Sequence, residues 1–239
     1  MDTIKFDKKN VRIVAHRGLS GIEKENTNSA FVAAGNRSYY GIETDIRKTA
    51  DGHFIVNHDH ALTRVAGENV PVEEVSLAVA QSVVLFDKDG SKDRLDLRPC
   101  TLENYLSICK KYEKHCVLEL KSEFTAEETE QFINIIKSFD YLDNLTFISF
   151  KYDNLVKIRE ILPDQPVQYL FSEISEEVVE RSIAAKFDVD VHYTELTAEY
   201  VKRFHDAGLC VNCWTVDSPE DAERLVEIGV DYITSNILE

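Results

Sequence analysis

The chain has 239 residues, which is too short for two full α/β domains. Hydrophobic residues make up 44% of it, enough for one sizeable core. Its formal net charge is −16, from 43 acidic against 27 basic residues, so the surface as a whole repels nucleic acid and anionic lipid headgroups. An anionic substrate would need local attraction from a bound cation and a few basic side chains. Solubility alone explains the charge equally well.

Five Cys residues, an odd number without the spacing of a disulfide scaffold, indicate free thiols in a reducing compartment. No segment is long and apolar enough to span a bilayer, and residues 1–10 lack the apolar run of a secretion signal. We therefore expect a cytoplasmic protein with no membrane anchor and no nucleic-acid partner.

Short β-rich runs alternate along the chain with amphipathic stretches. The expected strands, in order, are 11–15, 41–46, 54–58, 116–120, 145–149, 167–170, 189–192, 210–214 and 231–234. The expected helices are 29–35, 102–112, 126–138, 152–162, 176–185, 198–207 and 219–228. This alternation predicts βαβ units and a parallel sheet, and the chain length is typical of a single (β/α)8 TIM barrel.

Nine strands are one more than such a barrel needs, and the short connection before the third strand identifies the extra one. Only residues 47–53 separate the second and third strands, whereas a parallel crossover needs about a dozen residues. Asp51-Gly52 within this connection is a hairpin turn signal. We therefore expect 54–58 to run antiparallel to the second strand, as an arm beyond the barrel rim that makes the barrel slightly irregular.

The segment from about 61 to 99 has no βα rhythm and forms a small insertion in a single domain that spans 1–239. It contains a short apolar stretch at 75–86 and a charged run at 87–94. Two interpretations fit this composition. The segment is either a cap over the functional site or a disordered surface loop.

Charged residues gather where the predicted strands end, which is where barrel active sites lie. Glu43 and Asp45 are two apart on one strand and so share a face, as do Glu119 and Lys121 on another. Three carboxylates on the inner rim repel one another unless a cation binds between them, and they favour Mg²⁺ or Ca²⁺, with Mn²⁺ as a third option. Each carboxylate taken alone is equally typical of a helix cap or a surface ion pair.

Two histidines approach the same rim on separate segments. His16 and His58 have the side chain suited to general acid and general base catalysis, although a single rim histidine is more often structural. Arg17 offers a planar fork and Lys121 a compact charge for a phosphate group. Trp214 ends a strand, where it either packs in the core or forms an apolar wall for a glycerol or alcohol group.

These residues occur in an ordered set of short motifs. The set comprises His16-Arg17-Gly18, Glu25-Asn26-Thr27, Glu43-Thr44-Asp45, His58-Asp59, Leu118-Glu119-Leu120-Lys121 and Trp214-Thr215-Val216. It resembles the glycerophosphodiester phosphodiesterase family and covers nearly the whole chain, and the order makes the resemblance much more specific than any one motif.

The resemblance implies a slightly irregular TIM barrel that hydrolyses small-molecule glycerophosphodiesters to sn-glycerol 3-phosphate and an alcohol. It also implies roles for individual residues, which fall into four groups. Glu43, Asp45 and Glu119 would hold one divalent cation, His16 and His58 would serve as acid and base, Arg17 and Lys121 would bind the phosphate, and Glu25 and Asn26 would support the site.

The chain departs from the family pattern at two places. Lys24 stands where the family usually has Pro, and the residues 235–238 replace the usual Asp followed by Pro. Neither change is expected to remove a group that the chemistry needs. The insertion should shape the alcohol side of the pocket and so influence the choice of substrate.

Two other functions compete with this prediction. A related phospholipase-like enzyme would act on lysophospholipid or phosphoinositide at a membrane, and the net charge and missing anchor count against it. A non-catalytic barrel would have lost some of the carboxylates or histidines, and this sequence keeps all of them.

Overall fold

Eight parallel strands close into a barrel in the computed structural model, which describes residues 2–239. Around the barrel the strand order is β1-β2-β4-β5-β6-β7-β8-β9, and β9 pairs back onto β1. The strands are β1 (Arg12–Ala15), β2 (Gly41–Lys48), β4 (His115–Leu120), β5 (Leu145–Ser149), β6 (Val167–Phe171), β7 (Asp188–His192), β8 (Val211–Trp214) and β9 (Tyr232–Ser235). The predicted TIM barrel is confirmed, with strand ends within two residues of those expected.

The ninth strand, β3 (Phe54–Val56), lies outside this ring. It pairs antiparallel with the end of β2, with Ile46 opposite Val56 and Lys48 opposite Phe54. The hairpin turn contains Gly52, whose φ of 85° is the left-handed conformation that glycine adopts at little cost. The predicted antiparallel arm is therefore confirmed, and it carries the chain from β2 to His58.

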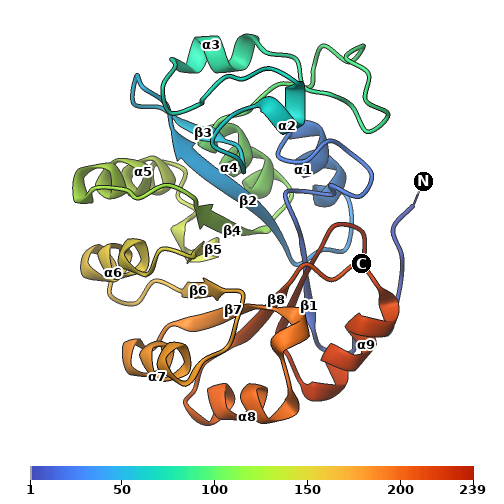
Figure 1. Cartoon of the computed structure of the whole chain (residues 1–239), viewed down its shortest axis with the longest axis vertical. Helices are drawn as coiled ribbons and strands as arrows, with labels where there is room; N and C mark the ends of the chain where they lie inside the picture. Colours follow the sequence, from blue (N-terminus) through green and yellow to red (C-terminus); the bar gives the residue numbers. More distant parts are fainter. Residues whose placement is uncertain (1) are drawn as a thin grey trace.

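Helices surround the barrel and pack their apolar faces on it (Figure 1). They are α1 (Asn28–Gly35), α4 (Leu102–Lys111), α5 (Ala126–Ser138), α6 (Tyr152–Ile161), α7 (Glu176–Ala185), α8 (Ala198–Asp206) and α9 (Pro219–Ile228), with short 3-10 turns at Leu142–Asn144 and Tyr193–Glu195. Hydroxyl side chains cap several N-termini, as Thr125 does for α5 and Ser218 for α9. These caps explain why the sequence located the helix starts well.

Residues 61–99 form a layer next to α1, where Arg94 and Asp96 contact Ser29 (Figure 1). This segment contains two short helices, α2 (Thr63–Ala66) and α3 (Leu77–Ser82). It also encloses a small hydrophobic cluster of its own, in which Leu62, Val72 and Leu97 are fully buried. A disordered loop would bury no such cluster, so that interpretation of the insertion is wrong.

No helix within residues 2–239 combines the length and the apolar character that crossing a bilayer requires. The five cysteines are all unpaired, and four of them are buried. Cys213 lies in the core, whereas Cys210 is partly exposed just before β8 begins. The expectation of free thiols is thus met.

Candidate active site

Three carboxylates converge inside the rim of the barrel at the C-terminal ends of the strands. Glu43 and Asp45 lie two apart on β2, and Glu119 on β4 is the direct neighbour of Asp45 in the parallel register. One carboxylate oxygen from each residue lies within 4.8 Å of the other two, and all three side chains are buried. The residues predicted as metal ligands are therefore brought together.

The protonation of this triad reflects crowded negative charge. Burial and the Asp45 and Glu119 carboxylates raise the pKa of Glu43 well above its usual range, and burial and Asp45 raise the pKa of Glu119 to about 8. Burial also opposes ionisation of Asp45, but the positive charges of Arg17 and Lys121 outweigh it and lower the pKa of this carboxyl. Asp45 Oδ1 is buried without a hydrogen-bond partner. A divalent cation would give that oxygen a partner and relieve the repulsion, so the residues fit such an ion.

The loop between β1 and α1 folds around these carboxylates in a strained conformation. Arg17 and Asn26 have φ values of 54° and 56°, in the left-handed region that non-glycine residues rarely adopt. Gly18 has a φ of 75°, and a Cβ there would approach Ala30 to 2.7 Å, so the position requires glycine. The turn lets the backbone N–H of Arg17 donate to Glu43 Oε2 at 2.7 Å. Strain of this kind is concentrated at functional sites.

Three consecutive residues of the same loop each hold a different part of the site. Glu25 Oε1 accepts a hydrogen bond from Nη1 of Arg17 at 2.8 Å. Asn26 Nδ2 donates to Asp45 Oδ2 at 2.7 Å, and Thr27 caps the N-terminus of α1. Glu25 and Asn26, expected as supporting residues, therefore contact two of the predicted site residues directly.

Two basic side chains stand beside the triad. Arg17 Nε lies 3.5 Å from Asp45 Oδ2 and makes no hydrogen bond, although it is buried. Lys121 Nζ lies 2.8 Å from Glu119 Oε1 and 3.8 Å from Asp45 Oδ1. Both residues line the same cavity, so each can contribute positive charge to an anion held there.

His16 follows β1 and is oriented by an amide. Its Nδ1 lies 2.7 Å from Asn236 Oδ1. Asn236 Nδ2 donates to Asp217 and its Oδ1 also accepts from the Ser20 hydroxyl, so the amide orientation is fixed. His16 Nδ1 must therefore carry the proton, which leaves Nε2 as an acceptor. Burial and then the charge of Arg17 lower the pKa of His16 to about 4.

His58 follows the β3 arm and is oriented by a carboxylate. Its Nδ1 lies 2.8 Å from Asp59 Oδ1, and Asp59 Oδ2 accepts from Nε of Arg64 at 2.7 Å. Burial lowers the pKa of His58, while the Asp45 and Asp59 carboxylates act against that shift. The two histidines thus differ in the group that faces Nδ1: a neutral amide for His16 and an anion for His58.

A cavity of about 90 Å³ joins these groups. Trp214 forms part of its wall and meets the ring of Phe150 edge to face, with centroids 5.5 Å apart. Asp190 of β7, whose carbonyl accepts a hydrogen bond from the Trp214 indole at 3.3 Å, contributes a buried carboxylate whose Oδ1 has no hydrogen-bond partner. Trp214 therefore lies at the site, as an apolar wall would.

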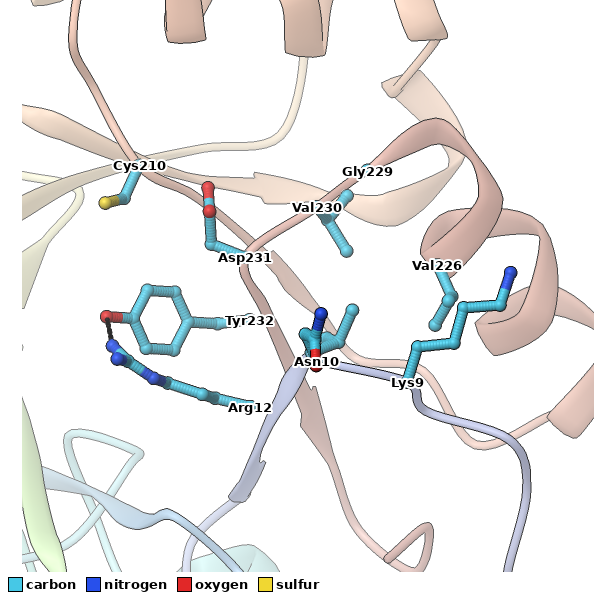
Figure 2. Close-up of a pocket in the computed structure, with 10 residues that line it drawn as sticks. Lys9, Asn10, Arg12, Cys210, Val226, Gly229, Val230, Asp231 and Tyr232 are labelled. Carbon is cyan, nitrogen blue, oxygen red and sulfur yellow. Dashed lines mark hydrogen bonds between the residues drawn. The ribbon is translucent and has the colours of Figure 1, made fainter.

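A larger cavity of about 520 Å³ lies at the opposite end of the barrel, where the strands begin. Figure 2 shows Arg12 beneath Tyr232, with Nη1 donating to the Tyr232 hydroxyl at 2.7 Å. Arg12 also packs over the ring of Tyr40. Within residues 2–239 the carboxylate triad lies at the other end, where barrel enzymes react, so the smaller cavity is the candidate active site.

Several residues at the site carried no clear signal in the sequence. Asn236 belongs to the C-terminal run that departs from the family pattern, yet it contacts His16 directly, so that departure lies at the site itself. Arg64 sits in the insertion, and Asp190 is one of two acidic residues on β7. Asp188 and Asp190 are two apart and share one face of β7, so the alternation of inward and outward positions does not distinguish them.

Known proteins resemble this chain along most of its length. The sequence profile described as the glycerophosphoryl diester phosphodiesterase family matches residues 16–238. A glycerophosphodiester phosphodiesterase of Caldanaerobacter subterraneus subsp. tengcongensis is 27% identical over 227 residues, which cover 94% of this chain and 93% of that one. The family match confirms the likeness inferred from the ordered motifs.

Solved structures share the fold along almost the whole chain. A putative glycerophosphoryl diester phosphodiesterase from Silicibacter pomeroyi has a TM-score of 0.86 at 25% identity, covering 95% of this chain and 90% of that one. A phosphodiesterase from Oleispira antarctica, solved in complex with the product sn-glycerol-3-phosphate, has a TM-score of 0.88 at 24% identity, with 98% and 96% covered. At 24% identity, the likeness to the Oleispira protein shows that the two proteins share a fold.

Proposed function

Because the chain belongs to the glycerophosphoryl diester phosphodiesterase family, we propose that it hydrolyses small glycerophosphodiesters to sn-glycerol 3-phosphate and a free alcohol, with the help of one divalent cation. The observation that carries the proposal is that the Glu43, Asp45 and Glu119 carboxylates converge beside a cavity lined by two histidines. No other group of metal-binding side chains occurs within residues 2–239.

The three carboxylates would hold the cation. Oxygen ligands without any cysteine favour a hard ion, so Mg²⁺ or Ca²⁺ is the preferred occupant, with Mn²⁺ as a third option. When bound, the ion would act as a Lewis acid toward a non-bridging phosphate oxygen. Arg17 and Lys121 would add fixed positive charge to the same phosphate, and Arg17 Nε is available because it makes no hydrogen bond.

The two histidines would divide the proton transfers. His16 keeps Nε2 as an acceptor, and its pKa, lowered to about 4, leaves the ring neutral at pH 7, so it is free to take the proton of the attacking hydroxyl. Burial lowers the pKa of His58, but Asp59 at Nδ1 opposes that shift and stabilises the imidazolium form, so we assign His58 the proton transfer to the leaving alcohol oxygen. The phosphorus gains a bond to the attacking oxygen as the bond to the alcohol oxygen breaks.

Two attacking groups fit this scheme. The neighbouring glycerol hydroxyl would form a cyclic phosphate that water then opens, whereas water would give sn-glycerol 3-phosphate in one step. Phosphorus-31 NMR of a reaction in progress distinguishes the two, because only the first route passes through a cyclic phosphate signal. Trp214 and Phe150 would supply an apolar face for the carbon chain of the glycerol or the alcohol.

A phospholipase-like function at a membrane has less support from the surface. Five large hydrophobic side chains are exposed in residues 2–239, and among them only Phe150 lines the cavity. Such an enzyme would need a continuous apolar or basic ridge beside the rim. We therefore place the substrate among small, water-soluble diesters.

A substrate screen tests the proposal. Glycerophosphocholine, glycerophosphoethanolamine, glycerophosphoglycerol and lysophosphatidylcholine micelles would be supplied separately. A coupled dehydrogenase would detect sn-glycerol 3-phosphate from the soluble diesters, and a coupled choline oxidase would detect choline released from the micelles. We expect turnover of the soluble diesters with Mg²⁺, Ca²⁺ or Mn²⁺, and none in EDTA. Full turnover in thoroughly chelated buffer, or turnover of the micelles alone, would overturn the proposal.

A further inference from the structure

One arginine of the insertion contacts both carboxylates that orient the site. Arg64 lies on α2, and its Nη1 and Nη2 donate to the two oxygens of Glu25 at 2.7 and 2.8 Å. Its Nε donates to Asp59 Oδ2 at 2.7 Å. A single guanidinium therefore fills three acceptor positions on two different segments, the β1–α1 loop and the end of the β3 arm.

Each of those carboxylates has a second partner inside the site. Glu25 Oε1 accepts from Arg17, whose guanidinium borders the carboxylate triad. Asp59 Oδ1 faces His58 Nδ1 at 2.8 Å. Arg64 thus stands at the centre of two chains of hydrogen bonds, one that ends on the phosphate-binding arginine and one that ends on the imidazole.

We propose that Arg64 is a positioning residue that fixes the His58 imidazole and the Arg17 guanidinium relative to each other, and that the insertion thereby assembles the active site. This inference rests on the proposed function. The planar fork of arginine suits the task because its donors are spread over three nitrogens of one rigid group, whereas the three donors of a lysine ammonium share one freely rotating nitrogen. Without it, Glu25 and Asp59 would keep their inner partners but lose the contact that sets their own orientation.

The effect on catalysis follows from the precision that the chemistry needs. Partners that orient a reacting group from behind typically contribute about 10–100-fold to activity, because a small misplacement of that group is enough to slow the reaction. Arg64 is about half exposed, so its contribution to folding stability is expected to be small. Loss of activity should therefore exceed any loss of stability.

The insertion provides a matched control. Arg94 also lies in the insertion and also reaches the β1–α1 loop, where its Nη1 donates to Glu23 at 2.7 Å, and it pairs with Asp96 at 2.9 Å. Glu23 makes no contact with the triad or with either histidine in the described contacts. Arg94 therefore anchors the insertion to the same β1–α1 loop without touching the groups that orient the site.

The test compares R64A, R64K and R94A in the full chain with saturating divalent metal. We expect R64A to lower kcat through His58 and to raise KM through Arg17, with kcat/KM about 10–100-fold below the parent. R64K should be intermediate, because one ammonium cannot fill all three positions. R94A should stay within about twofold of the parent while its melting temperature changes as much as that of R64A. Equal kinetic losses in R64A and R94A would overturn the inference.

A second measurement tests the orientation of the His58 imidazole and does not require catalysis. In protein labelled with ¹⁵N-histidine, the Nδ1 proton of His58 should exchange with solvent more slowly in the parent than in R64A, and R94A should match the parent. Unchanged exchange in R64A would overturn the role of Arg64. An inactive parent protein with the expected exchange difference would instead count against the proposed function alone.

Discussion

Asp45 on β2 and Glu119 on β4 are directly opposite each other in the parallel register, so the barrel itself forces their carboxylates to face a common point. Glu43, two residues before Asp45, points to the same interior. Three acidic groups in one buried place are costly unless a cation compensates them. This arrangement leads to the first prediction.

Divalent metal should stabilise the fold measurably. At a metal concentration about 100 times the dissociation constant, the free energy of unfolding should rise by about 2.7 kcal/mol. Differential scanning fluorimetry with EDTA and with added Ca²⁺, Mg²⁺ or Mn²⁺ measures it. Burial, Asp45 and Glu119 oppose ionisation of Glu43, so the neutral amide of E43Q should make the metal-free form melt above the metal-free parent while its response to metal weakens. A melting temperature that does not change with any of the added metals would contradict the prediction.

Replacement of either site histidine should abolish most activity without unfolding the protein. H16A and H58A should each lower kcat by about 10²–10⁴-fold, because each removes one proton-transfer group. Steady-state kinetics and thermal melting check both parts. H205A is the control, since His205 pairs with Asp231 far from the cavity and should leave kcat within about twofold. Activity within tenfold of the parent in either site variant would defeat the assignment.

Asn236, the neutral partner of His16, should determine the pH at which kcat/KM rises on the acidic side of its pH profile. N236D would place a carboxylate against Nδ1, which favours the imidazolium and raises the pKa of His16. Since the proposed base must be neutral, the rise of kcat/KM with pH should move to higher pH. N236A removes the acceptor and should lower kcat about 10–100-fold. A profile of N236D that overlays the parent, or shifts to lower pH, would show that His16 is not the base.

Glu239 lies far from the active site, and its carboxylate should make the free energy of unfolding depend on pH in the acidic range. Its carboxylate accepts from the Ser38 backbone and hydroxyl at 2.6 and 2.7 Å, from the Thr3 hydroxyl at 2.7 Å, and pairs with Lys5. Burial opposes ionisation, but these donors outweigh it and lower the pKa of Glu239 from 4.5 to about 2. A carboxyl with a depressed folded pKa stabilises the protein above its unfolded pKa, and that contribution is lost as pH falls toward 2.

E239Q should therefore lower the free energy of unfolding at pH 7 by about 1–2 kcal/mol, and the difference should shrink as the pH falls from 4.5 to 2. Urea denaturation at pH 7 and pH 3 measures both values. The exposed Glu173 provides the control, because E173Q should change stability by less than about 0.5 kcal/mol at either pH. If the difference in free energy of unfolding between the parent and E239Q grows as the pH falls, the predicted direction of the pH dependence is wrong.

The strand and helix pattern was readable from the sequence because local signals agree with the fold. Threonine and serine caps, the proline at the start of α9 and the glycine turn before β3 all act within a few residues. The insertion was not readable in the same way. Its cluster joins Leu62, Val72 and Leu97, which are too far apart in sequence for any periodic pattern to connect them.

The sequence by itself determined which residues are the candidates for the chemistry. Glu43 and Asp45 share a face by the two-residue period of a strand, and the ordered motifs placed Glu119, His16 and His58 at strand ends. What only the tertiary structure decided is how those groups are held. Asn236 behind His16 and Arg64 between two carboxylates are contacts across 220 and 39 residues of chain, and no local preference encodes them, because they exist only once the barrel has closed.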